Sequence, residues 1–249
     1  FDSLTPIQEK TLPYILDNKN LIAKAKTGSG KTLAFGIGLL EKLEVKNFKI
    51  QSIVLCPTRE LADQVAVELR KLAKTIHNVK ILTLCGGVPF KPQVHSLYHQ
   101  AHIVVGTPGR ILKHFQEDSF KNLDVGTLVL DEADRMLDMG FIEDISRINS
   151  YLPQDKQTLL FSATYPVDIQ SLANEITFDP ILIEVESVHS EEIIEQKFIE
   201  ANHNKAQIIE KLLKFYQPKS CVIFCNMKIT CDELADDLGD NGFELQVLH

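Results

Sequence analysis

Short apolar runs alternate with amphipathic stretches of helical period along most of this chain, and this alternation constrains its fold more than any other feature. Several runs, such as residues 127–130, are apolar on both faces, which is typical of parallel strands covered by helices on each side. We therefore predict an α/β fold with a doubly wound parallel sheet. Its strands are predicted at residues 21–24, 52–56, 80–85, 102–105, 127–131, 158–162 and 181–185.

The charge distribution predicts two units. Residues 1–180 hold 20 basic and 21 acidic side chains, whereas residues 181–249 hold 6 and 13. A polar stretch at 184–192 separates the two regions and is typical of a domain boundary. We predict a first domain at residues 1–186, a linker at 187–192 and the N-terminal part of a second domain at 193–249.

The second unit is predicted to contain strands at 196–200, 221–224 and 244–248 and helices at 205–215 and 230–238. The strand at 221–224 is expected to be buried. Five elements are too few for a parallel α/β domain, which usually needs about 100 residues. We therefore expect this domain to be incomplete. Because the chain starts at Phe1 without an initiator Met, we expect it to be cut from a longer protein.

Composition excludes several classes of protein. The chain is 44% hydrophobic and 24% charged, and no apolar run approaches the roughly 20 residues of a membrane span. We do not expect a membrane protein. The net charge of −8 gives no overall attraction for nucleic acid, so any RNA or DNA contact must be local.

The cysteines and histidines predict no metal centre. Five cysteines are an odd number in a chain too large to need disulfides, which favours a reducing, cytoplasmic setting. Cys221 and Cys225 lack the spacing of a zinc pair, so we interpret them as buried strand residues. Among the eight histidines we find no convincing ligand pair or triad.

A glycine-rich segment follows the first predicted strand and precedes a helical stretch, as in a phosphate-binding loop. Backbone N–H groups in such a loop turn toward phosphate oxygens, and the helix N-terminus adds a positive end. Lys31 could reach the β and γ phosphates, and Thr32 could bind Mg²⁺. The alternative is a glycine turn with an incidental lysine. The segment consists of Ala25, Lys26, Thr27, Gly28, Ser29, Gly30, Lys31 and Thr32.

Three acidic residues end another buried strand, at the sheet edge where α/β proteins bind ligands. Asp131 is predicted to hold Mg²⁺, directly or through water, and Glu132 to orient and deprotonate an attacking water. A solvated acidic loop is the alternative, but the phosphate-binding loop about 100 residues upstream argues against it. Together the two segments predict Mg²⁺ and a nucleoside triphosphate.

The segment Asp131-Glu132-Ala133-Asp134 resembles the signature of the DEAD-box ATP-dependent RNA helicases, and among these the chain is most similar to the bacterial DbpA type. Other segments resemble further motifs of that family, in the family's order: residues 5–8, 57–62, 86–87, 107–110 and 162–164. The resemblance covers essentially the whole chain. It implies two RecA-like domains, the second incomplete here, with ATP and Mg²⁺ as cofactors.

The resemblance also assigns roles to individual residues. Thr5 and Gln8 would help bind the nucleotide, with Gln8 hydrogen-bonding the adenine. Without its motif neighbours, Gln8 would be interpreted as a glutamine at the start of a helix. Asp134, Ser162 and Thr164 would couple hydrolysis to strand separation, although the two hydroxyls could simply satisfy the local backbone. The implied RNA-binding residues are Pro57, Thr58, Arg59, Gly87, Thr107, Gly109 and Arg110, with surface ion pairs as the alternative for the two arginines.

The family resemblance implies an ATP-dependent RNA helicase, a monomer that grips single-stranded RNA by its backbone and separates short duplexes. Its RNA would be ribosomal, and its role would be large-subunit assembly. An ATP-dependent RNA clamp and a DNA-directed motor are the alternatives. Because the later motifs of the second domain, with their γ-phosphate arginines, are not in the sequence, we expect this chain alone to be only weakly active.

Overall fold

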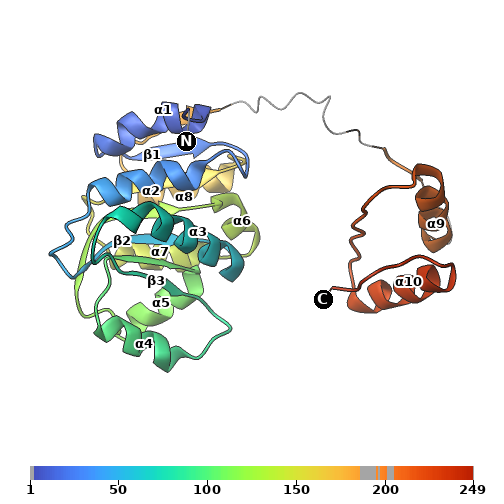
Figure 1. Ribbon diagram of the computed structural model, residues 1–249. Coiled ribbons are helices and arrows are strands. Elements are labelled where there is room, and N and C mark those ends of the chain that lie inside the picture. The colour runs from blue at the N-terminus through green and yellow to red at the C-terminus, as the bar shows by residue number, and fades with distance from the viewer. Residues whose placement is uncertain (1–2, 186–194, 196, 201–204, 249) are drawn as a thin grey trace. The chain divides into compact units, whose positions relative to one another are not determined.

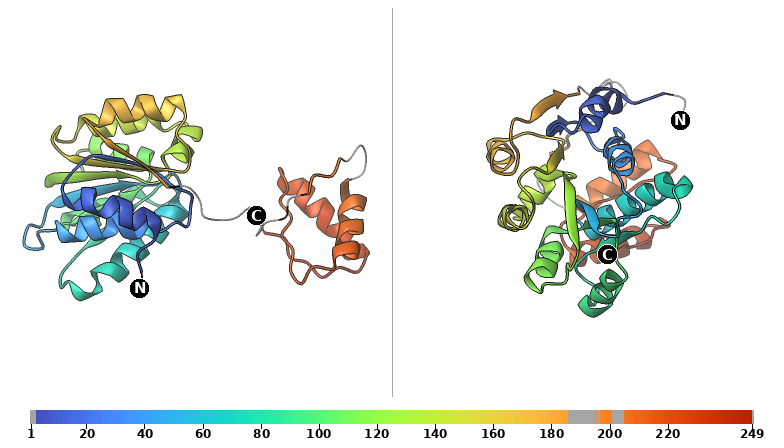
Figure 2. Two further views of the ribbon diagram at one scale, coloured as in Figure 1. Left: turned by 90° about the horizontal axis from the view of Figure 1, so that it is seen from above. Right: turned by 90° about the vertical axis from the view of Figure 1, so that its left-hand side faces the viewer.

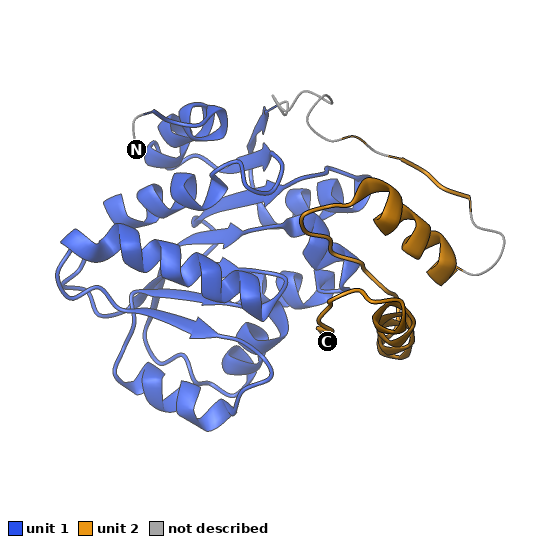
Figure 3. Ribbon diagram, turned by 45° about the vertical axis from the view of Figure 1, so that its right-hand side comes forward, with its two compact units in different colours: residues 1–188 blue, residues 189–249 orange. Residues whose placement is uncertain are grey.

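The computed structural model describes residues 3–185, 195, 197–200 and 205–248, and it divides into two compact units at residues 188/189 (Figure 3). Unit 1 comprises residues 1–188 and unit 2 residues 189–249. The linker predicted at 187–192 lies outside the described residues.

Unit 1 is built around a seven-stranded sheet with the order β3-β4-β2-β5-β6-β1-β7, in which all neighbouring strands are parallel. The prediction of a doubly wound parallel sheet is confirmed, and each of its seven strands forms within a few residues of the predicted range. The strands are β1 (Leu21–Lys24), β2 (Ile50–Leu55), β3 (Ile81–Leu84), β4 (Ile103–Gly106), β5 (Leu123–Leu130), β6 (Gln157–Ser162) and β7 (Ile181–Glu184).

Two layers of helices cover this sheet (Figure 1; Figure 2, left). One apolar cluster joins the sheet to α1 (Pro6–Leu16), α2 (Lys31–Glu41) and α3 (Arg59–Leu72). The other joins it to α4 (Phe90–Tyr98), α5 (Pro108–Gln116), α6 (Ala133–Asp138), α7 (Ile142–Ser150) and α8 (Val167–Ile176). A short 3₁₀ turn, η1 (Ala73–Thr75), follows α3.

Alternate residues of each central strand enter opposite layers, which explains why the strands are apolar on both faces. In β5, Leu128 and Leu130 pack in one cluster, and Val129 packs in the other. All three side chains are completely buried. Because all strands run parallel, their carboxyl ends lie along one edge of the sheet, and the loops that follow them share that edge.

Unit 2 contains two helices among its described residues, α9 (Lys205–Tyr216) and α10 (Lys228–Asp240), close to the predicted ranges. Its three predicted strands are wrong for the residues that the structure describes, because 197–200, 221–224 and 244–248 carry no strand. A strand needs a neighbour to pair its backbone N–H and C=O groups. No described segment of unit 2 provides one.

The burial predicted for residues 221–224 is also wrong. Phe224 is 93% exposed and Val222 is 76% exposed. Cys221 is exposed and Cys225 is half-buried, so neither is the buried strand cysteine that the sequence pattern indicated. By contrast, Cys56 and Cys85 of unit 1 are buried.

No helix within the described residues has both the length and the apolar character that a membrane span requires.

Candidate functional site

The glycine-rich loop connects β1 to α2, as its sequence predicts. Gly30 is the N-cap of α2 and has φ +93°, and Gly28 has φ +81°, a region that L-residues rarely adopt. A Cβ on Gly30 would lie 2.4 Å from Nε2 of Gln8. Lys31 is 5% exposed, and its ammonium donates to the carbonyl of Ala25 at 3.1 Å, across the loop. Glycine is therefore required here both for backbone conformation and for close packing.

Gln8 connects helix α1 to this loop. Its Nε2 donates to the carbonyl of Gly30 at 3.1 Å, and its Oε1 accepts from the backbone N–H of Thr5 at 3.0 Å. Gln8 is 3% exposed. A carboxamide has two donor hydrogens and two acceptor lone pairs, so each end of Gln8 keeps the capacity for one further bond. This geometry is compatible with the adenine contact implied by the resemblance, which remains a prediction.

Asp131 directly follows β5, and its backbone N–H donates to the carbonyl of Leu55 at 2.9 Å. The side chain is 3% exposed. Burial raises the pKa of Asp131 to about 6; Lys31 opposes this rise, whereas the nearby carboxylate of Glu132 adds to it. Asp131 Oδ1 is buried and has no hydrogen-bond partner among the described residues. A buried carboxylate oxygen without a partner is well suited to a cation.

Mg²⁺ fits this donor set, because the ion usually takes one or two protein ligands plus waters and substrate phosphates. Asp131 and Thr32 would hold it. Ser29 Oγ, on the glycine-rich loop, is a second buried oxygen without a partner among the residues that the structure describes. Thr32 is half-buried in the first turn of α2. Among the described residues, no group of three or more His, Cys, Asp or Glu could form an all-protein metal site.

Glu132 is oriented by its backbone and by two neighbouring side chains. It is the N-cap of α6 with φ +55°, an unusual value for a residue with a side chain. Its Oε1 accepts from Oγ1 of Thr27 at 3.0 Å, and its Oε2 accepts from Nη1 of Arg135 at 3.3 Å. Thr27 lies on the glycine-rich loop, so this carboxylate is fixed directly to the predicted phosphate site.

Asp134 is hydrogen-bonded to Ser162 and Thr164, which follow it by 28 and 30 residues. Asp134 Oδ2 accepts from the N–H of Thr164 at 2.9 Å and from its hydroxyl at 3.0 Å. Ser162 Oγ accepts from the N–H of Asp134 at 3.2 Å. Burial alone would raise the pKa of Asp134, but these hydrogen bonds outweigh it and hold the pKa below its usual value. The hydroxyls of Ser162 and Thr164 therefore both form hydrogen bonds with Asp134 of the acidic segment.

The residues predicted to bind RNA lie in loops at the same edge of the sheet, along its other half. Thr58 is the N-cap of α3, and its hydroxyl accepts from the N–H of Leu61 at 3.2 Å. Arg59 is exposed and pairs with Asp63 at 3.7 Å, whereas Pro57 is buried. Thr107 is the N-cap of α5, whose first turn contains Gly109. Helix N-termini present unpaired N–H groups that favour anions such as phosphate.

Arg110 is half-buried and points back to the glycine pair that follows β3. Its Nη2 donates to the carbonyl of Val88 at 3.0 Å, and its Nη1 donates to Oε1 of Gln93 at 2.8 Å. Gly87 is exposed and has φ +76°. Among the described residues Arg110 has no ion-pair partner, so the alternative of a surface ion pair is not found for it there, whereas Arg59 does form one.

Three neighbours of these residues were not predicted from the sequence: Gln93, His114 and Arg135. Arg135 follows the acidic segment directly, so its proximity to Glu132 could have been inferred from helical spacing. Gln93 and His114 lie on different helices, and their spacing carries no signal of a contact. Their meeting depends on the packing of α4 against α5.

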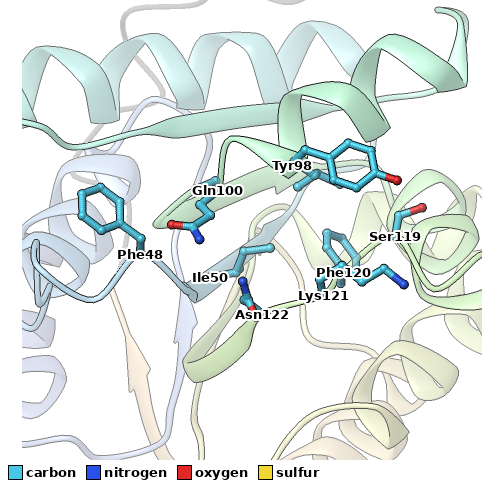
Figure 4. Close-up of a pocket in the computed structure, with 10 residues that line it drawn as sticks. Phe48, Ile50, Tyr98, Gln100, Ser119, Phe120, Lys121 and Asn122 are labelled. Carbon is cyan, nitrogen blue, oxygen red and sulfur yellow. The ribbon is translucent and has the colours of Figure 1, made fainter.

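One hollow of unit 1 does not contain any predicted site residue (Figure 4). It has a volume of about 150 Å³ and lies where β2 and β5 begin, between the end of α4 and the loop before β5. Phe48, Ile50, Tyr98 and Phe120 are among its lining residues. The amino-terminal ends of β2 and β5 lie opposite the edge that carries the acidic and glycine-rich segments, so we assign this hollow no role in the predicted chemistry.

The glycine-rich loop after β1 and the acidic residue after β5 together define a P-loop nucleotide-binding domain of the RecA-like class. The sequence model of the DEAD/DEAH box helicase family matches residues 5–172. The chain therefore belongs to the DEAD/DEAH box helicase family, as the resemblance predicted.

Individual relatives agree with this membership. The chain is 49% identical over 248 residues to the ATP-dependent RNA helicase DbpA of Escherichia coli, covering 99% of this chain and 54% of the relative. It is 42% identical over 251 residues to the DEAD-box ATP-dependent RNA helicase CshA of Geobacillus kaustophilus, covering 100% of this chain and 54% of the relative. The chain thus spans about half the length of the curated relatives it matches.

Solved structures give the same family. A DEAD box protein from Methanococcus jannaschii has a TM-score of 0.70 at 42% identity, with coverage of 96% of this chain and 64% of that chain. Saccharomyces cerevisiae Dbp5 bound to RNA and ADP BeF3 has a TM-score of 0.83 at 29% identity, with coverage of 100% and 64%.

Proposed function

We propose that this protein is an ATP- and Mg²⁺-dependent RNA helicase, which grips single-stranded RNA by its backbone and locally separates short duplexes. One observation carries the proposal. The predicted phosphate-binding loop follows β1, and the predicted catalytic residues Asp131 and Glu132 follow β5. The predicted RNA residues follow β2, β3 and β4, and β2 pairs directly with β5. Both groups therefore share one edge of one rigid sheet.

The nucleotide half of this sheet edge, with the glycine-rich and acidic segments, can bind a triphosphate and prepare a water for attack. The glycine-rich loop would cradle the phosphates through its backbone N–H groups, and Lys31 would turn from the Ala25 carbonyl toward the terminal phosphates. Glu132, held by Thr27 and Arg135, would orient the attacking water and accept its proton.

Mg²⁺, when bound, would neutralise charge that develops on the phosphates. Asp131 and Thr32 would hold it, and the oxygen of Asp131 that has no partner in the described part of the chain supports this assignment.

The predicted coupling residues Asp134, Ser162 and Thr164 support a link between ATP hydrolysis and the grip on RNA. Asp134 lies three residues after Asp131 and is bonded to Thr164, which follows β6. A shift of the acidic segment during hydrolysis would therefore be transmitted through Asp134 to the segment that follows β6.

The Dbp5 structure bound to RNA and ADP BeF3 supports the choice of RNA and ATP as ligands.

The RNA half is suited to phosphates and not to bases. Two helix N-caps, at Thr58 and Thr107, and the exposed Gly87 offer backbone N–H groups, and phosphate contacts carry no sequence information. We propose that the RNA is ribosomal, that the protein acts as a cytoplasmic monomer, and that its role is in large-subunit assembly, as the resemblance implies. An ATP-dependent RNA clamp uses the same residues and remains the second candidate.

Binding and strand displacement test the function. We would measure the affinity for single-stranded RNA with and without a non-hydrolysable ATP analogue and Mg²⁺, using DNA of the same sequence as competitor. Displacement of one strand of a short RNA duplex would follow in the same buffer. Lys31→Ala is the matched variant without the phosphate-binding lysine. We expect nucleotide-dependent RNA binding that Lys31→Ala loses, and weak turnover for this chain alone.

Each result has a distinct meaning. Nucleotide-dependent RNA binding without displacement, even in a version extended through a complete second domain, would favour the clamp. Equal competition by DNA would favour a DNA-directed motor, because a protein distinguishes RNA through its 2′-hydroxyl. RNA affinity that is the same with and without nucleotide, in both the chain and Lys31→Ala, would refute the proposed coupling.

A further inference from the structure

Gln93 of α4 makes three hydrogen bonds to groups that lie 8, 17 and 21 residues from it in the sequence. Its Nε2 donates to the carbonyl of Cys85 at 3.0 Å. Its Oε1 accepts from Nη1 of Arg110 at 2.8 Å and from Nε2 of His114 at 3.1 Å. Gln93 is 8% exposed and His114 is completely buried. A buried carboxamide that uses both ends in this way is costly to replace, because its partners would lose their bonds.

These contacts bracket the glycine pair Gly86–Gly87. Gln93 holds the carbonyl of Cys85, the residue before the pair. Arg110 holds the carbonyl of Val88, the residue after it. Because Gln93 also accepts from Arg110, the two tethers are joined to each other. A positive-φ glycine at Gly87 has many accessible conformations, so such tethers would restrict it.

An aromatic cluster holds this network in place. The ring of His114 stacks on Phe90, with centroids 4.4 Å apart, and the guanidinium carbon of Arg110 lies 5.7 Å from the centroid of the same ring. Burial lowers the pKa of His114 to about 4, and the nearby charges of Arg110 and Lys113 contribute. His114 is therefore neutral at pH 7, and it donates to Gln93 from Nε2.

Arg110 uses two of its five N–H donors in these bonds. An arginine held by fixed acceptors loses less conformational freedom when it meets a phosphate than one that is mobile before binding. The network therefore affects two elements of the predicted RNA half: the conformation of the glycine pair and the direction of the guanidinium.

We propose that Gln93 is a positioning residue, which orders the Gly86–Gly87 loop and Arg110 for contact with the RNA backbone. This role rests on the RNA-binding function proposed above. Gln93 itself is nearly buried, so it acts through the loop and the arginine and not by touching RNA.

Two measurements on the same variants test this role. Gln93→Leu removes the hydrogen bonds at similar volume, and Gln116→Leu changes an exposed glutamine on the helix that carries Arg110. Hydrogen exchange followed by mass spectrometry would report on residues 84–92 without RNA. We expect exchange there to be about tenfold faster in Gln93→Leu, because the bond to the charged Arg110 and two neutral bonds are lost, and unchanged in Gln116→Leu.

RNA affinity is the second measurement, with Arg110→Ala and the double variant included. We expect Gln93→Leu to bind single-stranded RNA about tenfold more weakly than the unaltered chain, and the double variant to bind no more weakly than Arg110→Ala. Nucleotide affinity should stay within about twofold, because the β1–α2 loop is not touched. This split distinguishes positioning from general loss of structure.

The two measurements fail separately. Unchanged hydrogen exchange at residues 84–92 in Gln93→Leu would overturn the positioning role, whatever the RNA affinity of the variant. Fully additive losses in the double variant would also overturn it. If the unaltered chain does not bind RNA, the proposed function fails and the RNA role of Gln93 fails with it, while the exchange data still decide whether Gln93 orders the loop.

Discussion

The two units contain similar apolar segments, but they bury them very differently. Phe161 in β6 of unit 1 is completely buried and meets Phe35 with ring centroids 5.5 Å apart. Phe224 lies in an equally apolar run of unit 2, yet it is 93% exposed. In unit 1 the strand has neighbours on both sides, whereas the described part of unit 2 has no strand to pair with. An apolar run therefore becomes a buried strand only where its backbone has partners.

The most direct test of this difference in burial is to truncate one phenylalanine in each unit. Phe161→Ala leaves a cavity in a core that cannot collapse fully, and it should lower the free energy of unfolding by about 3 to 5 kcal/mol. Phe224→Ala should change it by less than about 0.5 kcal/mol, because little area is buried. Urea denaturation followed by circular dichroism would measure both. Similar losses would mean that unit 2 has a core of its own.

Lys31→Ala tests whether nucleotide binding belongs to unit 1. The ammonium is buried at the glycine-rich loop, and a charge-assisted contact to phosphate contributes about 2 to 3 kcal/mol. We expect roughly 50-fold weaker binding of a fluorescent ATP analogue. Lys228→Ala at the start of α10 is the matched change in unit 2 and should have no effect. A comparable loss from Lys228→Ala would contradict the assignment.

The buried His114 makes the stability of unit 1 depend on pH. Its pKa is about 4 in the folded chain and 6.5 in its ordinary state, so the unfolded chain binds more protons between these values. The free energy of unfolding should therefore fall as the pH drops from 6.5 toward 4, by about 3 kcal/mol from this residue. The contribution is fully present above pH 6.5.

Urea denaturation at pH 7, 5.5 and 4.5 would measure this slope. His114→Gln should flatten it, whereas His77→Gln, a change at an exposed histidine, should leave it as it is. The same slope in His114→Gln and in the unaltered chain would show that another group is responsible.

The smallest effects should be the same in both units. Lys71 pairs with Glu68 in α3, and Lys214 pairs with Glu210 in α9. Exposed helical pairs at these spacings contribute about 0.3 to 0.5 kcal/mol, and salt screens them. Lys71→Ala and Lys214→Ala should each cost about that much at low ionic strength, as thermal unfolding would report. A loss above about 1 kcal/mol for either would indicate a second role for that lysine.

Much of unit 1 could be predicted from its sequence, because its signals are local. Short apolar runs, several of them apolar on both faces, predicted all seven strands of the sheet. The spacing around Gly28 and Gly30 predicted a glycine-rich loop between a strand and a helix, and both residues have positive φ. The acidic segment was predicted at a strand end, and Asp131 lies there with its side chain buried.

The rest required contacts between distant segments. The strands predicted in unit 2 do not form in its described residues, because a run of apolar residues contains no information on whether a partner strand is present. The bonds of Asp134 to Thr164, and of Thr27 to Glu132, bridge 30 and 105 positions. No sequence spacing indicates bonds of this kind, since they depend on which strands become neighbours.

The sequence by itself determined the elements of unit 1, the family and the residues that carry the predicted chemistry, because each of these depends on neighbouring residues. Only the tertiary structure decided which carboxylates meet which loops, and that Gln93 connects α4 to Cys85, Arg110 and His114. The physical reason is that hydrogen-bond partners and burial depend on the order of strands in the sheet and on the packing of helices, which local preferences do not fix.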